Sequence, residues 1–355
     1  MAPHWARATR FGTRIVSAVV HIDDITYELP HELIAQVPIE PRDSARLLVD
    51  QGLERALHRR VSDIGEFLDK DDVLVVNNTR VIPARLHLRR GTGGAVEVLL
   101  LESVGSSSAE WEALIRPGGR LRIGETLYSN DGEPLIEVGS RTLAGDTFIV
   151  TMLVDDVDSM LDQHGTMPLP PYITTPLADP DRYQTVYAKL PGSAAAPTAG
   201  LHFTTRLMSE LRDAGIQIAN VDLTVGLDTF APISAANPLE HKIHTESYSV
   251  PLETLERCQS AKRVVAVGTT ASRALETAAS TGQASGRSKL FITPGYDWKM
   301  VDLMITNFHM PRTSLLLMIE SFIGKRWRTL YQQAIDEKYR LLSFGDAMLL
   351  DRHLN

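Results

Sequence analysis

Two short runs of purely apolar residues constrain the fold of this chain most. Residues 73–76 read VLVV after a pair of aspartates, and residues 264–267 read VVAV before a glycine and two threonines. An unbroken apolar run of this length is typical of a strand that is buried on both faces, as in a parallel sheet covered by helices. Residues 216–225 form a further candidate strand, and Thr204 or Thr205 can cap the helix before it. The pattern predicts an α/β domain.

The sequence pattern is different in residues 81–154. Short stretches in which apolar and polar residues alternate are separated by turn sequences such as GTGG at 91–94 and NDG at 130–132. Alternation with such turns predicts antiparallel strands and a small β-barrel. We therefore predict the α/β fold class in a discontinuous form. Residues 22–80 and 155–355 make the α/β domain, and residues 81–154 make a β-barrel inserted into it.

Both ends of the chain carry further patterns. In residues 1–21, three arginines and a short apolar stretch precede the first acidic residue, Asp23. The apolar stretch is short for a secretory signal, so we expect a disordered extension or a start-site artefact. Near the other end, apolar residues recur at helical spacing from Leu316 to Tyr339 and predict one long amphipathic helix.

Charge and cysteine content argue against several classes of protein. The chain has 36 Lys and Arg against 44 Asp and Glu, a formal net charge of −8, which disfavours nonspecific nucleic-acid binding but leaves room for a local basic patch. The single cysteine, Cys258, cannot form an intramolecular disulfide or by itself hold a zinc ion or an iron–sulfur cluster. We expect a reducing, cytoplasmic setting. Since no apolar run approaches the ~20 residues that span a bilayer, we expect no membrane-spanning segment.

The residues that follow the second apolar run are candidates for ligand binding. Gly268, Thr269 and Thr270 come directly after residues 264–267 and open a predicted helix that extends through Ala279. A helix N-terminus leaves backbone N–H groups free to bind a carboxylate or a phosphate. The competing interpretation is that one of the threonines only caps the helix.

Two other segments combine small residues with groups that exchange protons. Residues 192–203 are rich in Gly and Ala, which permit a ligand to approach closely, and include Thr198 and His202. A core loop packed by small residues is the alternative. Asn307 and His309 lie in a predicted loop before the C-terminal helix, where function is common, although His309 could simply satisfy a buried carbonyl.

Histidine and arginine clusters complete the candidates. His241, His244 and Glu246 lie close together in the sequence, but without a helical frame or cysteine partners they favour hydrogen bonding or proton transfer over metal ligation. We predict no metal site. Arg80 and Arg85, like Arg42 and Arg46 earlier in the chain, could bind phosphates or a carboxylate. Structural ion pairs are the competing explanation for these arginines.

Taken in order, the segments resemble one enzyme family. They include NNTRVIPARL at 77–86, MPLPPY at 167–172, YQTVY at 183–187, AAPTAGLHF at 195–203, VGTT at 267–270 and TNFHMP at 306–311. In this combination they resemble the S-adenosylmethionine:tRNA ribosyltransferase-isomerases of queuosine biosynthesis. The resemblance runs from about residue 27 to residue 350. It implies the same fold, an α/β domain interrupted by a small β-barrel.

The resemblance also implies a reaction. The ribosyl part of S-adenosylmethionine is transferred and isomerised onto 7-aminomethyl-7-deazaguanine in tRNA, giving epoxyqueuosine-tRNA, adenine and methionine. S-adenosylmethionine is then a substrate, and no bound cofactor is expected. The implied partner is a tRNA of the GUN anticodon class that carries the deazaguanine precursor, acted on by a cytoplasmic monomer without a membrane partner.

Site residues follow from the resemblance as hypotheses. His202 or His309 would carry a proton, and Thr198 would assist at the catalytic centre. The helix start at Thr269 and Thr270 would hold the methionine carboxylate. The other substrate-binding candidates are Asn77, Arg80, Arg85, Tyr296, Asn307, His241, His244 and Glu246.

One departure from the family pattern keeps other functions open. Thr224 stands where the family usually has histidine, and Asp228 where it often has glycine. Threonine can donate a hydrogen bond but cannot serve as a general base near neutral pH. A paralogue that ribosylates a small amine or only cleaves S-adenosylmethionine is therefore an alternative. A noncatalytic nucleotide- or tRNA-binding protein is a third hypothesis.

Overall fold

A nine-stranded mixed sheet forms the centre of the larger domain in the computed structural model, which describes residues 21–104, 109–119, 121–142, 145–226, 232, 233, 235, 237–241, 243 and 245–354. We predict an extension or a start-site artefact for residues 1–21, and residues 1–20 of this range lie outside the described residues. In spatial order the strands are β16 (Ser285–Ser288), β14 (Glu246–Ser249), β13 (Gln217–Leu223), β3 (Val73–Asn77), β15 (Val264–Val267), β17 (Leu303–Asn307), β18 (Ala347–Asp351), β1 (Arg46–Val49) and β2 (Leu57–Arg60).

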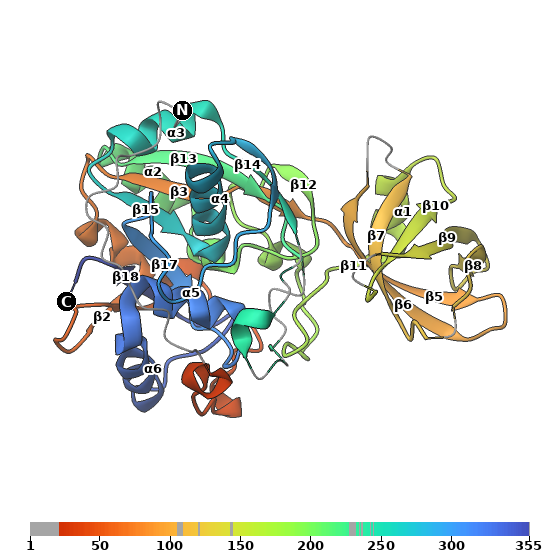
Figure 1. Ribbon diagram of the computed structural model, residues 1–355, viewed down its shortest axis with the longest axis horizontal. Coiled ribbons are helices and arrows are strands. Elements are labelled where there is room, and N and C mark those ends of the chain that lie inside the picture. Colours follow the sequence, from red (N-terminus) through yellow and green to blue (C-terminus); the bar gives the residue numbers. More distant parts are fainter. Residues whose placement is uncertain are drawn as a thin grey trace.

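Helices cover both faces of this sheet (Figure 1). The α-helices are α2 (Thr205–Asp213), α3 (Leu252–Ser260), α4 (Gly268–Thr281), α5 (Ser314–Ile323) and α6 (Trp327–Asp336). Short 3₁₀ segments are η1 (Ile22–Ile25), η2 (His31–Leu33), η3 (Arg42–Ser44), η4 (Val61–Phe67), η5 (Pro180–Tyr183), η6 (Thr198–His202), η8 (Pro238–Glu240) and η9 (Gly324–Arg326).

The central strands are parallel and buried on both faces. Strand β3 pairs in parallel with β13 and β15, and β15 pairs in parallel with β17. Val73 and Val75 pack into the core that contains α3 to α6, whereas Leu74 and Val76 pack into the core that contains α2 and η4. The double burial explains the unbroken apolar runs, and it confirms the two strands predicted from them.

The barrel is made of antiparallel strands and is closed by an additional pairing. Its strands are β5 (Arg85–Arg90), β6 (Ala95–Ser103), β7 (Glu110–Arg116), β8 (Glu125–Tyr128), β9 (Pro134–Arg141) and β10 (Phe148–Met152). They pair in the order β5-β6-β7-β10-β9-β8, and the pairing between β5 and β8 closes the ring. Figure 1 shows the barrel at one side of the α/β domain, to which it is joined by extended segments of chain. This arrangement confirms the predicted fold class.

The barrel unit is longer than its predicted range of 81–154. Helix α1 (Val157–His164) buries Val157, Met160 and Leu161 in the barrel core, and β11 (Gly165–Thr166) pairs with β5. The boundary at residue 154 is therefore too early, because the apolar face of α1 packs against the barrel strands. Between the two units, β4 (Thr79–Val81) pairs in parallel with β12 (Leu190–Ser193).

The prediction of one long C-terminal helix is wrong. The apolar stripe is divided between α5 and α6, with η9 between them. Gly324 ends α5 with a positive φ of 65°, a backbone conformation that breaks the helix and that glycine adopts without strain. Throughout the described part of the chain, helices fall short of the length and apolar character needed to cross a membrane.

Candidate active site

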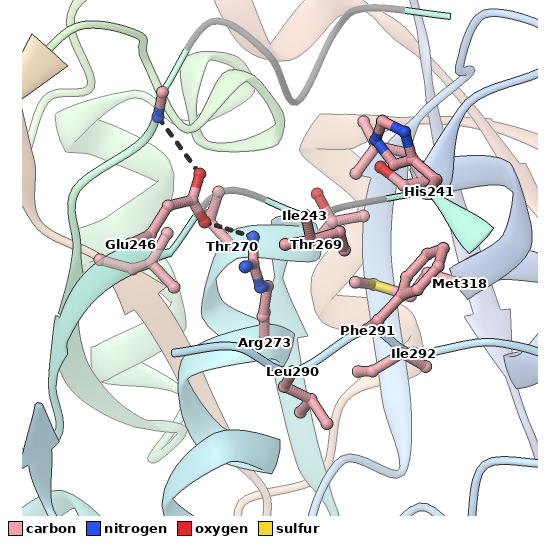
Figure 2. A pocket seen from close by; sticks show the side chains of 14 residues that line it. His241, Ile243, Glu246, Thr269, Thr270, Arg273, Leu290, Phe291, Ile292 and Met318 are labelled. Atoms are coloured by element: carbon pink, nitrogen blue, oxygen red, sulfur yellow. Dashed lines mark hydrogen bonds and ion pairs between the residues drawn. The ribbon is translucent and has the colours of Figure 1, made fainter. Parts of the chain in front are cut away.

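The carboxyl ends of the parallel strands meet at one edge of the sheet, and cavities open there. This is the edge at which ligands bind in open α/β sheets. One of these cavities, here called the main cavity, has an empty volume of about 640 Å³ (Figure 2). Its lining residues are Leu223, Gly226, His241, Ile243, Glu246, Thr269, Thr270, Arg273, Leu290, Phe291, Ile292, Ser314, Leu315 and Met318. Two smaller cavities adjoin it and are lined in part by Thr198, Asn307 and His309.

The main cavity has an apolar side and a polar side. Figure 2 shows Phe291, Ile292 and Met318 on one side, and Glu246 and Arg273 on the other. The ring of His241 lies edge-on to Phe291, with ring centroids 6.3 Å apart. An apolar wall beside a few convergent polar groups is typical of a small-molecule site, since apolar area supplies affinity and the polar groups fix orientation.

A buried ion pair forms the polar side. The Arg273 guanidinium of α4 donates to Glu246 Oε2 of β14, and both residues are less than 10% exposed. Glu246 Oε1 also accepts a hydrogen bond from the Gly226 backbone N–H at 3.2 Å. Burying two charges is costly unless they are paired and hydrogen-bonded, so the pair fixes both side chains at the cavity wall.

Helix α4 begins at the cavity without a side-chain cap. Its N-cap residue is Val267, which makes no capping hydrogen bond, and Gly268 has a φ of 90°. Neither Thr269 nor Thr270 is the N-cap, so the capping alternative does not account for them. The Thr270 hydroxyl is buried and has no hydrogen-bond partner among the described residues. Free N–H groups and a free hydroxyl at a helix N-terminus favour an anionic group in the cavity.

Asn307, the last residue of β17, joins the other predicted residues into one network. Thr198 Oγ1 donates to Asn307 Oδ1 at 3.0 Å. Asn307 Nδ2 donates to the carbonyl of Leu342 at 3.3 Å and contacts His202 Nε2 at 3.1 Å. The Leu342 carbonyl can only accept, which fixes the orientation of the amide. His202 Nε2 must therefore accept from Asn307, so the imidazole proton lies on Nδ1.

Both histidines of the site are held neutral. Burial, together with the smaller effect of the Arg340 and Arg42 charges, lowers the pKa of His202 to about 4. Burial lowers the pKa of His309 to about 3. His309 Nε2 lies 2.9 Å from Thr306 Oγ1, and the His309 backbone is held by Tyr331 and Tyr27. Each ring therefore carries no charge at neutral pH.

Comparison with known proteins decides the family. Residues 22–350 match the family model described as queuosine biosynthesis protein. The chain belongs to the queuosine biosynthesis family. It is 50% identical over 331 residues to the S-adenosylmethionine:tRNA ribosyltransferase-isomerase of Rubrobacter xylanophilus, a match that covers 92% of this chain and 97% of the relative. The protein of the same name from Desulforamulus reducens is 44% identical over 342 residues. This match covers 93% of this chain and 100% of the relative.

A solved structure shows the same relationship. The crystal structure of the S-adenosylmethionine tRNA ribosyltransferase from Thermotoga maritima matches with a TM-score of 0.52 at 34% identity, covering 92% of this chain and 99% of the other. The resemblance to the family inferred from the sequence motifs is therefore confirmed.

Not all residues that the family resemblance suggested lie at these cavities. Asn77 is fully buried and binds the backbone of Leu223 and Thr79, so it joins the ends of β3 and β13. Arg80 lines a groove between the barrel and the α/β domain. Arg85 donates to the carbonyl of Leu169 at 3.1 Å. Tyr296, Arg80, Arg85 and Asn77 are all absent from the linings of the three cavities. His244 and Asp228 lie outside the described residues.

Other residues of the site were missed by sequence reasoning. Arg273 follows Thr270 by one helical turn and is the one basic residue of α4, a signal that could have identified it. Phe291 and Met318 come from segments whose place at the cavity depends on the tertiary fold. Within the described ranges, no three His, Cys, Asp or Glu side chains are grouped so as to hold a metal ion.

Proposed function

We propose that this protein transfers and isomerises the ribosyl part of S-adenosylmethionine onto 7-aminomethyl-7-deazaguanine in tRNA, giving epoxyqueuosine-tRNA, adenine and methionine. The observation that carries the proposal is a cavity with an apolar side, a buried ion pair and an open helix N-terminus, in a chain that matches the family over residues 22–350. The relatives named above carry the name of this activity.

The cavity suits the groups of S-adenosylmethionine. Adenine would lie against Phe291 and the neighbouring aliphatic side chains, where aromatic contact and burial of apolar area supply affinity. The methionine carboxylate would accept hydrogen bonds at the N-terminus of α4, including one from the free Thr270 hydroxyl. The methionine ammonium would face Glu246, whose carboxylate forms part of the cavity wall.

The proposed chemistry balances without an oxidant. The sulfonium acidifies its C5′ protons, and loss of one proton to a base gives an ylide that opens the ribose ring and expels adenine. The amine of the tRNA base attacks the opened sugar, and closure of the epoxide releases methionine. The protons lost from C5′ and from the amine of the tRNA base balance those taken up by the departing adenine and by the opened sugar.

We assign the proton transfer to His309 rather than His202. His309 lines both smaller cavities, whereas the His202 Nε2 lone pair is occupied by Asn307. Burial lowers the pKa of His309 to about 3, which keeps the ring unprotonated across the neutral range, as a proton acceptor must be, but also weakens it as a base. His202, Asn307 and Thr198 would position the reacting groups.

We further propose that the acceptor is a tRNA of the GUN anticodon class and that the protein acts as a monomer in the cytoplasm. Support comes from the enzyme name of the relatives, which specifies tRNA as substrate. A deazaguanine at the first anticodon position defines the GUN class. A single chain already contains every residue of the proposed site.

The test is to incubate the protein and S-adenosylmethionine with and without tRNA that bears the deazaguanine precursor. Mass spectrometry follows adenine, methionine and the tRNA nucleosides. Epoxyqueuosine formed only with the tRNA supports the proposal. Adenine release without tRNA would instead indicate a paralogue that cleaves S-adenosylmethionine, and binding without any product would indicate a noncatalytic protein.

A further inference from the structure

We infer that Arg46, Arg60 and Arg340, here called the edge arginines, bind the backbone phosphates of nucleotides next to the modified base. This inference rests on the proposed function, because it assigns a role to the surface beside the proposed site. It concerns how tRNA is held, and the residues that carry it take no part in the cavities described above.

The sheet places the edge arginines beside the site. Asn307 at the end of β17 is paired with Ala347 at the start of β18, and Ala347 is paired with Leu47 of β1. Adjacent strands are about 4.8 Å apart, so Leu47 lies about 10 Å from Asn307 along the same edge. Arg46 begins β1 and is paired with Arg60, the last residue of β2. Directly opposite residues of an antiparallel pair project from the same face.

A single segment connects Arg340 to the site. Leu342 lines one of the smaller cavities, and its carbonyl accepts the hydrogen bond from Asn307. Arg340 stands two residues earlier and lies close enough to His202 for its charge to lower the pKa of that histidine. The segment that contains Leu342 therefore lines the smaller cavity and also carries Arg340 close to the site.

A buried carboxylate holds two of the edge arginines together. Asp346, which is 1% exposed, accepts hydrogen bonds from the backbone N–H groups of Arg46 and Arg340, each at 2.8 Å. The side chains are held by acceptors that carry no formal charge. Arg46 donates to the carbonyl of Glu337 at 2.6 Å, and its guanidinium stacks on Tyr339 at 3.7 Å.

The charges of the edge arginines are not neutralised by contact ion pairs. Arg60 donates to the carbonyl of Ser44, and Arg340 to that of Val37. Within the described residues, no carboxylate oxygen lies within 4.0 Å of any of the three guanidinium groups. The nearby Glu337 carboxylate is bound by Arg55 instead. Oriented guanidinium groups with donors to spare match the geometry of phosphate oxygens.

RNA supplies the complementary groups. Nucleotides that flank a base bound in the cavities remain covalently attached to it, so their phosphates must lie near the cavity mouth. Phosphate contacts position a nucleic acid without reading its sequence. Three arginines at one edge also reconcile tRNA binding with the net charge of −8, because binding of phosphates depends on the local potential rather than on the total charge.

The test compares four proteins in a titration with unmodified tRNA transcript at several salt concentrations. They are the wild type, a triple Arg46→Gln, Arg60→Gln, Arg340→Gln variant, the matching triple lysine variant, and Arg212→Gln. Arg212 is an exposed arginine at the end of α2, on the opposite edge of the sheet, and it forms no ion pair with a carboxylate of the described residues. Each phosphate contact contributes about 0.7 to the slope of log K against log salt for single-stranded RNA.

We expect the glutamine triple to lower that slope by about 2, whereas the lysine triple and Arg212→Gln retain the wild-type slope. Affinity for S-adenosylmethionine should be the same in all four proteins. A wild-type slope in the glutamine triple overturns the inference. If that triple fails to fold, the exposed Arg60→Gln alone must lower the slope by about 0.7. Failure of the proposed function gives a different result. The wild-type protein then yields no epoxyqueuosine, although the salt slopes of the wild type and the glutamine triple still differ.

Discussion

Asn307 donates a hydrogen bond from Nδ2 to His202 Nε2 at 3.1 Å, and this bond defines the protonation state of the histidine. The same amide accepts from Thr198 and donates to the Leu342 carbonyl. Three segments that are distant in sequence therefore meet at the end of one central strand. The contacts make Asn307 a positioning residue for the smaller cavities.

Asn307→Asp should raise the pKa of His202. A carboxylate still accepts from Thr198, but it cannot donate to Nε2, and its charge favours the imidazolium. The pKa of His202, about 4 in the wild type, should rise by more than one unit. Heteronuclear NMR of the imidazole nitrogens measures this. An unchanged pKa would mean that the amide does not set the protonation state.

Stability should fall between pH 6.5 and pH 5 because of the two neutral histidines. Their folded pKa values of about 4 and about 3 lie below the ordinary value near 6.5. In this range the unfolded chain binds protons that the folded protein does not, so the free energy of unfolding decreases as the pH falls. Each histidine should cost about 2 kcal/mol by pH 5.

Urea unfolding at the two pH values checks this contribution residue by residue. His309→Gln should lose about 2 kcal/mol less than the wild type over the same interval, because one titrating group is gone. The exposed His87→Gln is a matched control and should behave as the wild type. Equal losses in His309→Gln and in the wild type would contradict the assignment of a neutral buried His309.

Arg273→Met should destabilise the fold by about 3 kcal/mol, since it leaves the Glu246 carboxylate buried without its cationic partner. The double variant Arg273→Met, Glu246→Leu removes both charges and should recover most of this loss. It should nevertheless fail to bind S-adenosylmethionine, as measured by calorimetry. Recovery of binding together with stability would show that the pair serves only the fold.

Thr270→Val should separate binding from stability at the start of α4. The hydroxyl has no partner among the described residues, so its removal should change the free energy of unfolding by less than about 0.5 kcal/mol. Loss of one hydrogen bond to an anionic group should raise the KM for S-adenosylmethionine about tenfold. An unchanged KM in steady-state kinetics would place the carboxylate elsewhere.

The sequence predicts those parts of the fold that local pattern controls. Residues 73–76 and 264–267 are apolar throughout because helices cover both faces of the sheet, and the barrel strands alternate because one face is solvated. The helix break at Gly324 is not predicted from the pattern, because the apolar stripe continues on both sides of this residue. Helix α1 is assigned to the wrong unit because periodicity does not identify the surface against which a helix packs.

The site is predicted where strand ends carry polar residues. Thr269 and Thr270 come just after β15, and Asn307 is the last residue of β17 rather than part of the predicted loop, so their place at the sheet edge follows from the topology. Arg85 and Tyr296 are placed away from the cavities by tertiary contacts that motif order does not encode. Phe291 and Glu246 reach the cavity from a loop and from an antiparallel strand, which only the fold brings beside α4.

The most direct test of the account uses S-adenosylmethionine labelled with ¹³C in all five ribose carbons. The protein is given this donor and tRNA that carries the deazaguanine precursor, and the digested tRNA is examined by mass spectrometry. We predict an epoxyqueuosine that contains all five labelled carbons, with adenine and methionine formed in equal amounts to it. Unlabelled tRNA nucleosides, or adenine released without a labelled nucleoside, would contradict the proposed transfer.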